Sequence, residues 1–143
     1  MNRFRFRLES VLKVREAKED AKKREFGVKM GHFRREEGRM NELESQSEHH
    51  DKSRVEKGVG KLAVRGLIHD FFYARHLEKK QDDQRALVKK ARKDMEKKRG
   101  ELVEASKEKK VLERLKEKKH EEWSKEALKE EQALIDEIGR AHV

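Results

Sequence analysis

A repeat of apolar positions beginning at Leu77 constrains this chain more than any other feature. Alternate steps of four and three residues lead to Leu77, Gln81, Gln84, Val88, Ala91, Met95, Lys98, Leu102, Ala105, Lys109, Leu112, Lys116, Lys119 and Trp123. Eight of these fourteen positions are apolar or aromatic, against 33% in the whole chain. A period of 3.5 residues is that of a coiled-coil heptad. Because the pattern extends back to Leu67 and forward to Ile138, it predicts one helix over about 64–139.

Residues 4–56 repeat this pattern less regularly. Their apolar residues keep mostly three- and four-residue steps, at Phe4, Leu8, Val11, Leu12, Phe26, Met30, Phe33, Met40 and Leu43. The only apolar residues between Arg15 and Arg24 are two alanines. Three glycines follow within 27–38, and each weakens a helix by about 1 kcal/mol relative to Ala. Helix over about 4–56 is still favoured over loop.

Composition decides between long helices and disorder. Of the 143 residues, 48% are charged and only 33% are apolar, which is too few for a globular core at this length. Pro, the strongest helix breaker, is absent, as is Thr. A narrow apolar stripe between two helices is the structure that such a composition can support.

Gly58 and Gly60 mark the turn, expected over about 57–63. The chain is then one all-α domain over 1–143, an antiparallel coiled-coil hairpin with a longer second helix that projects at the C-terminus. Such a turn places residue i of the first helix beside a residue of the second helix whose number is about 124 − i. Leu12 then lies by Leu112, Met30 by Met95 and Phe33 by Ala91, while about 20 acidic C-terminal residues project past the first helix.

The net charge of +9 is unevenly distributed. Residues 1–15 carry five Lys or Arg against one Glu, residues 85–119 carry fifteen against seven acidic residues, and residues 120–143 carry three against seven. There is no Cys, no apolar run long enough to span a bilayer and no apolar segment typical of a signal peptide. These features favour a cytoplasmic protein without membrane insertion.

No residue pattern indicates an enzyme. A two-helix rod lacks a concave site, so we expect no catalytic residues and no cofactor. His69 and His76 share a helix face but lie two turns apart, too far to hold one metal. Gly58-Val59-Gly60 lacks the Lys and Ser or Thr of a phosphate-binding loop.

Two apolar clusters look suited to binding other proteins. Phe71, Phe72, Tyr73 and Leu77 follow the turn, and the seam between two helices has room for about two of them. The alternative is that they only seal the turn. Trp123, Leu128, Leu134 and Ile138 lie on the projecting end, where no first-helix partner is expected, and favour a partner site.

The chain resembles the FliJ family of flagellar export proteins. Its start matches in Phe4-Arg5-Phe6-Arg7-Leu8, Val11-Leu12 and Arg15-Glu16. Its end, from Leu112 to Gly139, matches in Leu112, Leu115-Lys116-Glu117-Lys118, Glu122, Trp123, Glu130, Gln132 and Asp136-Glu137. The glycine-containing turn followed by Leu67, Tyr73 and Leu77 also fits.

The resemblance implies a stalk-like component of the flagellar type III export apparatus, similar to the γ subunit of rotary ATP synthases. Such proteins insert their joined ends into the hexameric export ATPase, promote its assembly and activity, contact the membrane-embedded export gate and escort export chaperones. Carried over, the ATPase-binding residues are Phe4, Phe6, Leu8, Leu12, Arg15, Trp123, Glu130, Asp136 and Glu137. The gate-binding residues are Phe72, Tyr73 and Leu77. The free protein is expected to be a monomer, peripheral to the cytoplasmic side of the inner membrane when assembled.

Two alternatives remain open on the residues alone. The basic stretch 85–119 also suits a nucleic-acid-binding coiled coil, although it contains no aromatic residue for base stacking. The heptads also suit a passive scaffold that dimerises through its long helices, because heptads do not distinguish contacts within a chain from contacts between chains.

Overall fold

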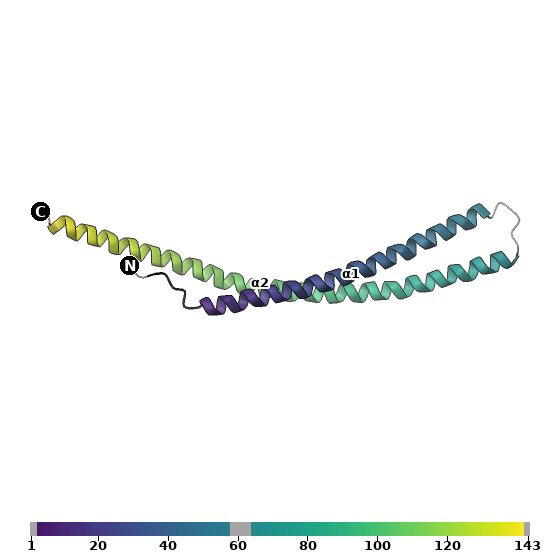
Figure 1. Ribbon diagram of the computed structural model, residues 1–143, viewed down its shortest axis with the longest axis horizontal. Coiled ribbons are helices and arrows are strands. Elements are labelled where there is room, and N and C mark those ends of the chain that lie inside the picture. Colours follow the sequence, from purple (N-terminus) through teal and green to yellow (C-terminus); the bar gives the residue numbers. More distant parts are fainter. Residues whose placement is uncertain (1–2, 58–63, 142–143) are drawn as a thin grey trace. The chain divides into compact units, whose positions relative to one another are not determined.

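The computed structural model describes residues 3–57 and 64–141 (Figure 1). It contains two long helices that pack against each other, α1 (Glu9–Lys57) and α2 (Val64–Ala141), with no strand in these ranges. The predicted fold class, an antiparallel coiled coil of two helices with a longer second helix, is confirmed. The turn predicted over about 57–63, with Gly58 and Gly60, lies outside the described residues except for Lys57, which ends α1.

Helix α1 begins at Glu9, later than the start expected near residue 4. The reason lies in the spacing of the apolar residues, because Phe4, Phe6 and Leu8 alternate with arginines. A period of two places alternate side chains on one face only in an extended chain, whereas a helix would scatter them. The turn into α1 is closed by the Glu9 amide, which donates to the Phe6 carbonyl over 3.1 Å.

The chain divides into two compact units. Unit 1 consists of Met1–Lys23 with Glu101–Val143, and unit 2 consists of Arg24–Gly100. Each unit holds one stretch of α1 beside one stretch of α2, and each has its own buried residues.

The core of unit 2 is built around Phe33. Phe33, Ala91 and Met95 are buried together, and Phe26, Met30 and Val88 pack against them. Two guanidinium groups cover the aromatic rings, with Arg92 5.4 Å from the centre of the Phe33 ring and Arg99 5.7 Å from that of Phe26. Both the phenylalanines and the arginines are one heptad apart, so the same contact repeats along the seam.

Unit 2 also contains a polar layer in its seam. Glu36 and Gln84 are buried, with 4% and 8% of their surface exposed. The Gln84 amide donates to the Glu36 carboxylate over 2.6 Å and to the Glu36 carbonyl over 2.9 Å, while Arg39 pairs with the same carboxylate. Because a buried carboxylate is costly without partners, this set of bonds favours one pairing of the two helices.

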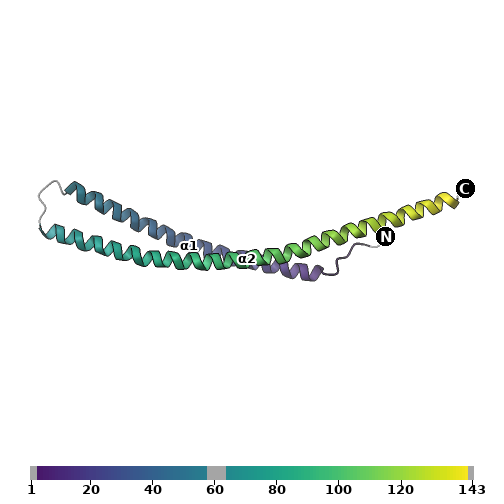
Figure 2. The same cartoon turned by 180° about the vertical axis from the view of Figure 1, so that it is seen from behind.

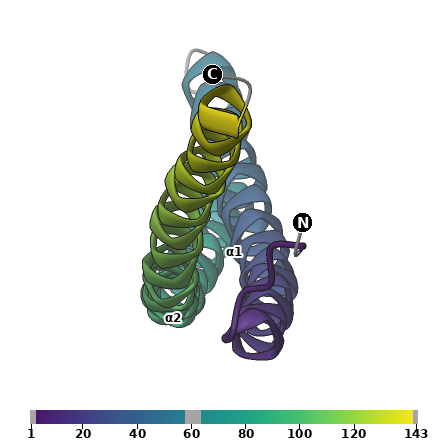
Figure 3. The same ribbon diagram turned by 90° about the vertical axis from the view of Figure 1, so that its left-hand side faces the viewer.

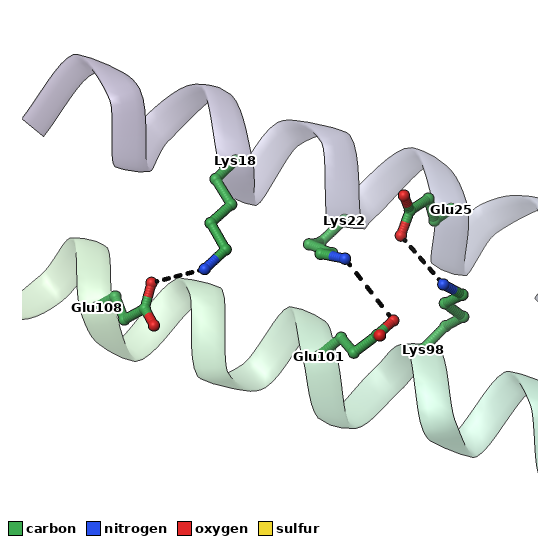
Figure 4. Close-up of polar contacts among 6 residues, drawn as sticks. All are labelled: Lys18, Lys22, Glu25, Lys98, Glu101 and Glu108. Atoms are coloured by element: carbon green, nitrogen blue, oxygen red, sulfur yellow. Dashed lines mark hydrogen bonds and ion pairs between the residues drawn. The ribbon is translucent and has the colours of Figure 1, made fainter.

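Unit 1 has a smaller apolar core. Leu12, Ala105 and Leu112 are buried there, and the carboxylate of Glu19, 4% exposed, lies among them on the seam. Ion pairs between the helices flank this core, from Lys18 to Glu108 at 3.1 Å and from Lys22 to Glu101 at 3.9 Å (Figure 4). In unit 2, Lys98 and Glu25 lie 3.4 Å apart in the same way (Figure 4).

The register of both helices follows from these contacts. In all three ion pairs of Figure 4 the two residue numbers add up to between 123 and 126. The sequence predicted a sum near 124, and Phe33 lies in one cluster with Ala91 as that register requires. Exposed ion pairs contribute little energy, so the register rests on the buried residues.

Candidate functional site

An extended segment at the start of unit 1 lies against α2. Residues 3–8 are not helical, and Phe4, Phe6 and Leu8 are half-buried while Arg3, Arg5 and Arg7 are exposed. The segment runs beside the C-terminal half of α2 in two opposite views (Figures 1 and 2). The alternation thus places the apolar side chains on α2 and the guanidinium groups in solvent.

Phe4 anchors this segment. Its ring lies 4.9 Å from the ring of His120, edge to face, and 5.9 Å from that of Trp123. Trp123 is half-buried as a result, although α1 begins only at Glu9. Figure 3, seen from the C-terminal side, shows the non-helical segment that leads into α1. The extended segment therefore takes the place of a helix along this part of α2.

A groove of about 1010 Å³ lies between the segment and α2. Its walls are Arg3, Phe4, Arg5, Phe6, Arg7 and Leu8 on one side and Leu115, Lys119, Trp123, Glu126, Ala127, Glu130, Glu131 and Leu134 on the other. The lining combines apolar side chains with three arginines from the segment and three glutamates from α2. Such a groove suits a protein segment with an apolar face and charges of both signs.

Beyond the groove, α2 continues with an exposed apolar stripe. Leu128, Leu134, Ile135 and Ile138 expose 53–65% of their surface. Every described residue from 128 to 141 is exposed, and the helix continues through them to Ala141 (Figure 2). Apolar side chains in such a row are typical of a surface that another protein covers.

The structure brings together most of the residues predicted to bind the ATPase. Phe4, Phe6, Leu8, Trp123 and Glu130 all line the groove. Leu12 is 3% exposed and serves packing within the seam.

The other three predicted residues do not line this groove. Arg15 donates to the carbonyl of Glu108 over 2.9 Å, and Asp136 accepts a bond from Gln132 over 3.2 Å. Asp136 and Glu137 are both exposed near the end of α2. Sequence reasoning missed Ala127 and Glu131 in the groove wall, and the alternation of arginine with apolar residues over 3–8 was the signal that could have found the groove.

The predicted gate-binding residues lie in unit 2 and differ in exposure. Phe72 is 64% exposed and Tyr73 is 39% exposed, with the Tyr73 ring 4.7 Å from that of His50 on α1. Leu77 is 3% exposed and packs within the seam. Only the first two can meet a partner while the helices stay packed, and Leu77 holds this turn of α2 in place.

Glu19 is the most perturbed titratable group. Its carboxylate accepts a hydrogen bond from Lys109 at 2.9 Å and pairs with Lys23 at 3.2 Å. The bond from Lys109, with further bonds from Ser106 and Lys23, lowers the pKa of Glu19 from 4.5 to about 2. The same contact raises the pKa of Lys109 above 10.5.

Within residues 3–57 and 64–141, no three His, Asp or Glu side chains are grouped closely enough to hold a metal ion. Neither helix, over its described length, is long and apolar enough to cross a membrane.

Comparison with known proteins identifies the family. The family model described as "Flagellar FliJ protein" matches residues 4–142. The chain belongs to the FliJ family. No curated protein and no solved structure gives a significant match to it. As a FliJ protein it is a component of the flagellar export apparatus and interacts with that machinery, and the family is not one of enzymes.

Proposed function

We propose that unit 1 of this FliJ protein binds the hexameric export ATPase as a central stalk and promotes its assembly and activity. The groove beside residues 3–8, which continues into the exposed stripe of α2, is the observation that carries the proposal. It offers apolar side chains for burial and charges of both signs for orientation. ATPase subunits arranged in a ring provide a central opening that a helical end of this kind fits.

Point variants of the full-length chain test the ATPase proposal. Leu134 lines the groove and Ile138 lies one turn beyond it, both more than half exposed, so changing both to Ser should leave the two-helix packing intact. Stimulation of the purified export ATPase should fall at least about tenfold, since burial of each side chain contributes roughly 1.5–3 kcal/mol.

The matched control is Val111→Ser, on the same helix, 61% exposed and outside the groove. This variant should stimulate the ATPase as the unmodified chain does. Equal stimulation by the Leu134→Ser, Ile138→Ser variant would contradict the proposed binding site.

We further propose that Phe72 and Tyr73 of unit 2 contact the export gate protein, so that the chain links the ATPase to the gate and to export chaperones on the cytoplasmic side of the inner membrane. Exposed aromatic side chains are the residues that most often dominate protein–protein binding. Phe72→Ala should weaken binding to the cytoplasmic part of the gate by at least tenfold in calorimetry, whereas Val28→Ala, at a side chain that is 68% exposed in the same unit, should not. Equal affinities of the two variants would count against this contact.

A further inference from the structure

The face of α2 that points away from α1 in unit 2 has a distinct composition. Residues seven apart lie on the same side of a coiled-coil helix, and Leu77, Gln84 and Ala91 define the buried side. The opposite side, here called the outer face, carries Ile68, Phe72, Arg75, Lys79, Lys89, Lys90, Lys93 and Lys97, together with the acidic residues Asp82, Asp83 and Glu96. All of these side chains are exposed.

The first turns of the outer face are apolar. Ile68 and Phe72 expose 52% and 64% of their surface, and Phe71 beside them exposes 56%. The rings of Phe71 and Phe72 lie 5.8 Å apart, and the Arg75 guanidinium lies 5.8 Å from the centre of the Phe71 ring. The outer face therefore begins with an apolar patch that has one cation, Arg75, at its edge.

Four lysines occupy the outer face farther along the helix. Residues 85–99 contain eight basic and two acidic residues. The three arginines and Lys98 of this stretch interact with other side chains of the protein. Arg85 pairs with Asp82 at 2.7 Å and Lys98 pairs with Glu25, while Arg92 and Arg99 lie over phenylalanine rings.

The other four basic residues of this stretch are Lys89, Lys90, Lys93 and Lys97. None of the four has an ion pair or hydrogen bond with any residue in the described part of the chain. Glu96, the acidic residue nearest to them in sequence on this side, is paired with Arg99 at 3.8 Å. The four ammonium groups therefore make no ion pair within the described part of the chain, and the outer face has a net positive charge because it carries six basic and three acidic residues.

We propose that the outer face binds the surface of an anionic lipid membrane. While Phe72 is not in contact with the gate protein, Ile68 and Phe72 would enter the boundary between headgroups and acyl chains, and the lysines would lie over the phosphates of acidic lipids. From Ile68 to Lys97 the face extends roughly 44 Å at 1.5 Å per residue, so a flat surface can meet all of it at once. This combination of one apolar anchor with a row of lysines is what peripheral membrane binding requires.

The same residues fit nucleic acid less well. No aromatic residue lies among the four lysines to stack on a base, and the exposed Ile68 and Phe72 have no counterpart along a phosphate backbone. Lysines contact phosphates as point charges without reading bases, so the row itself is compatible with both polyanions. The apolar end of the face decides in favour of lipid.

Vesicle co-sedimentation of the intact chain tests this inference. The probes are vesicles of phosphatidylcholine alone and vesicles containing about one third phosphatidylglycerol, at 50 mM and 500 mM salt. Binding should require phosphatidylglycerol and weaken at the higher salt. Changing Lys89, Lys90, Lys93 and Lys97 to Gln should lower the partition coefficient by on the order of 100-fold.

The matched control removes the same charge elsewhere on α2, by changing Lys110, Lys118, Lys125 and Lys129 to Gln. All four are exposed residues of unit 1, and this variant should keep most of the binding. An Ile68→Ser, Phe72→Ser variant should lower the partition coefficient roughly tenfold or more, even at 500 mM salt, because it removes apolar contact. Circular dichroism verifies that each variant is as helical as the parent.

Three results would overturn the proposal. These are absence of binding to the acidic vesicles, an equal loss with both lysine variants, and tighter binding of a duplex oligonucleotide that depends on the same four lysines. The last result would assign the face to nucleic acid instead. Because the vesicles contain no protein, none of these results bears on the ATPase or gate contacts.

Discussion

Glu19 occupies a seam position of α1 at which the heptad pattern favours an apolar side chain. Leu12, Phe26, Phe33 and Met40 lie at seven-residue steps from it, and all four are buried or half-buried. Its carboxylate is stabilised there by Lys109 on the facing helix and Lys23 on its own. A charged seam residue is tolerated when its partners replace the lost water, and it then favours the pairing that supplies them.

The lowered pKa of Glu19 predicts acid sensitivity. A carboxyl group with a pKa of 4.5 when unfolded and about 2 when folded stabilises the folded chain above pH 4.5. This contribution disappears as the pH falls from 4.5 to 2. Glu19→Gln should therefore lose less thermal stability over this range than the parent does, as measured by circular dichroism at 222 nm.

Glu16→Gln is the control for this experiment. Glu16 is exposed on the same helix, and the change removes the same charge. The acid sensitivity of this variant should equal that of the parent. If the Glu19→Gln variant showed the same loss between pH 4.5 and pH 2, the carboxylate would not contribute through its pKa.

Phe33 is the large side chain at the centre of the unit 2 core. It is 8% exposed and packs against Ala91 and Met95, with Arg92 over its ring. Phe33→Ala should lower the free energy of unfolding by about 3 kcal/mol, the lower end of the usual range because the seam is only one layer deep. Urea unfolding measures this change, and Val28→Ala, 68% exposed on the same helix, should change it by less than about 0.5 kcal/mol. Similar losses in both variants would show that Phe33 contributes no more than an exposed side chain.

At the scale of the element, α2 was the more predictable helix. Leu77, Ala91, Met95 and Leu112 keep one heptad pattern, and all four are buried. Steps of 3.5 residues place such side chains on one side of a helix whatever lies between them, so the sequence alone identifies the seam.

Helix α1 was harder to predict because its seam contains charged residues. Glu19 and Glu36 are buried, yet a lone glutamate in a sequence that is 48% charged looks like part of a solvated surface. Their partners Lys109 and Gln84 are about 90 and 48 residues away, and only the folded chain brings them together. Local patterns cannot reveal such contacts.

The prediction of a helix from about residue 4 was wrong for a different reason. Phe4 and Leu8 are four residues apart, which fits a helix, whereas Phe6 between them does not. The three together with the intervening arginines have a period of two, which only an extended chain can use. The groove of unit 1 depends on this conformation and could not be predicted while a helix was assumed.

Gly27 and Gly38 lie within α1, where glycine is unfavourable. A methyl group added at either position would meet no other atom within 4 Å, so packing does not require glycine there. Gly27→Ala and Gly38→Ala should each raise the free energy of unfolding by about 1 kcal/mol, because Ala loses less backbone entropy in a helix. Urea unfolding checks this, and a decrease in either variant would show that α1 needs a flexible backbone at that residue.

The last turns of α2 lie beyond the stretch of this helix that packs against α1. All side chains from 128 to 141 are exposed, whereas residues 88–112 contribute Ala91, Met95, Ala105 and Leu112 to the buried seam. Helical turns held only by their own backbone bonds open readily. Amide hydrogens of 128–141 should exchange at least about 100-fold faster than those of 88–112 in the free protein, as measured by mass spectrometry. Equal protection would mean that another surface covers this stretch.

At the scale of the whole molecule, the chain separates its surfaces between its two units. Unit 1 contains the groove and the exposed end of α2, and unit 2 contains Phe72, Tyr73 and the outer face. A protein of this composition has little apolar material. Part of what the seam leaves exposed lies at these surfaces, with Phe71, Phe72 and Tyr73 in unit 2 and Leu128, Leu134, Ile135 and Ile138 in unit 1. Long helices suit this use because they present separate contact sites along one chain at low cost in core residues.

The contacts of the seam also bear on whether the free protein is a monomer. Each layer described above, from Phe33 with Ala91 to Glu19 with Lys109, joins α1 and α2 of one chain. A helix pair closed within one molecule needs no second copy, so its melting temperature should not change between about 1 μM and 100 μM protein. Light scattering should give a mass near 17.1 kDa over the same range. A dimer whose melting temperature rises with concentration would instead mean that the heptads pair between chains, because only association between molecules depends on concentration.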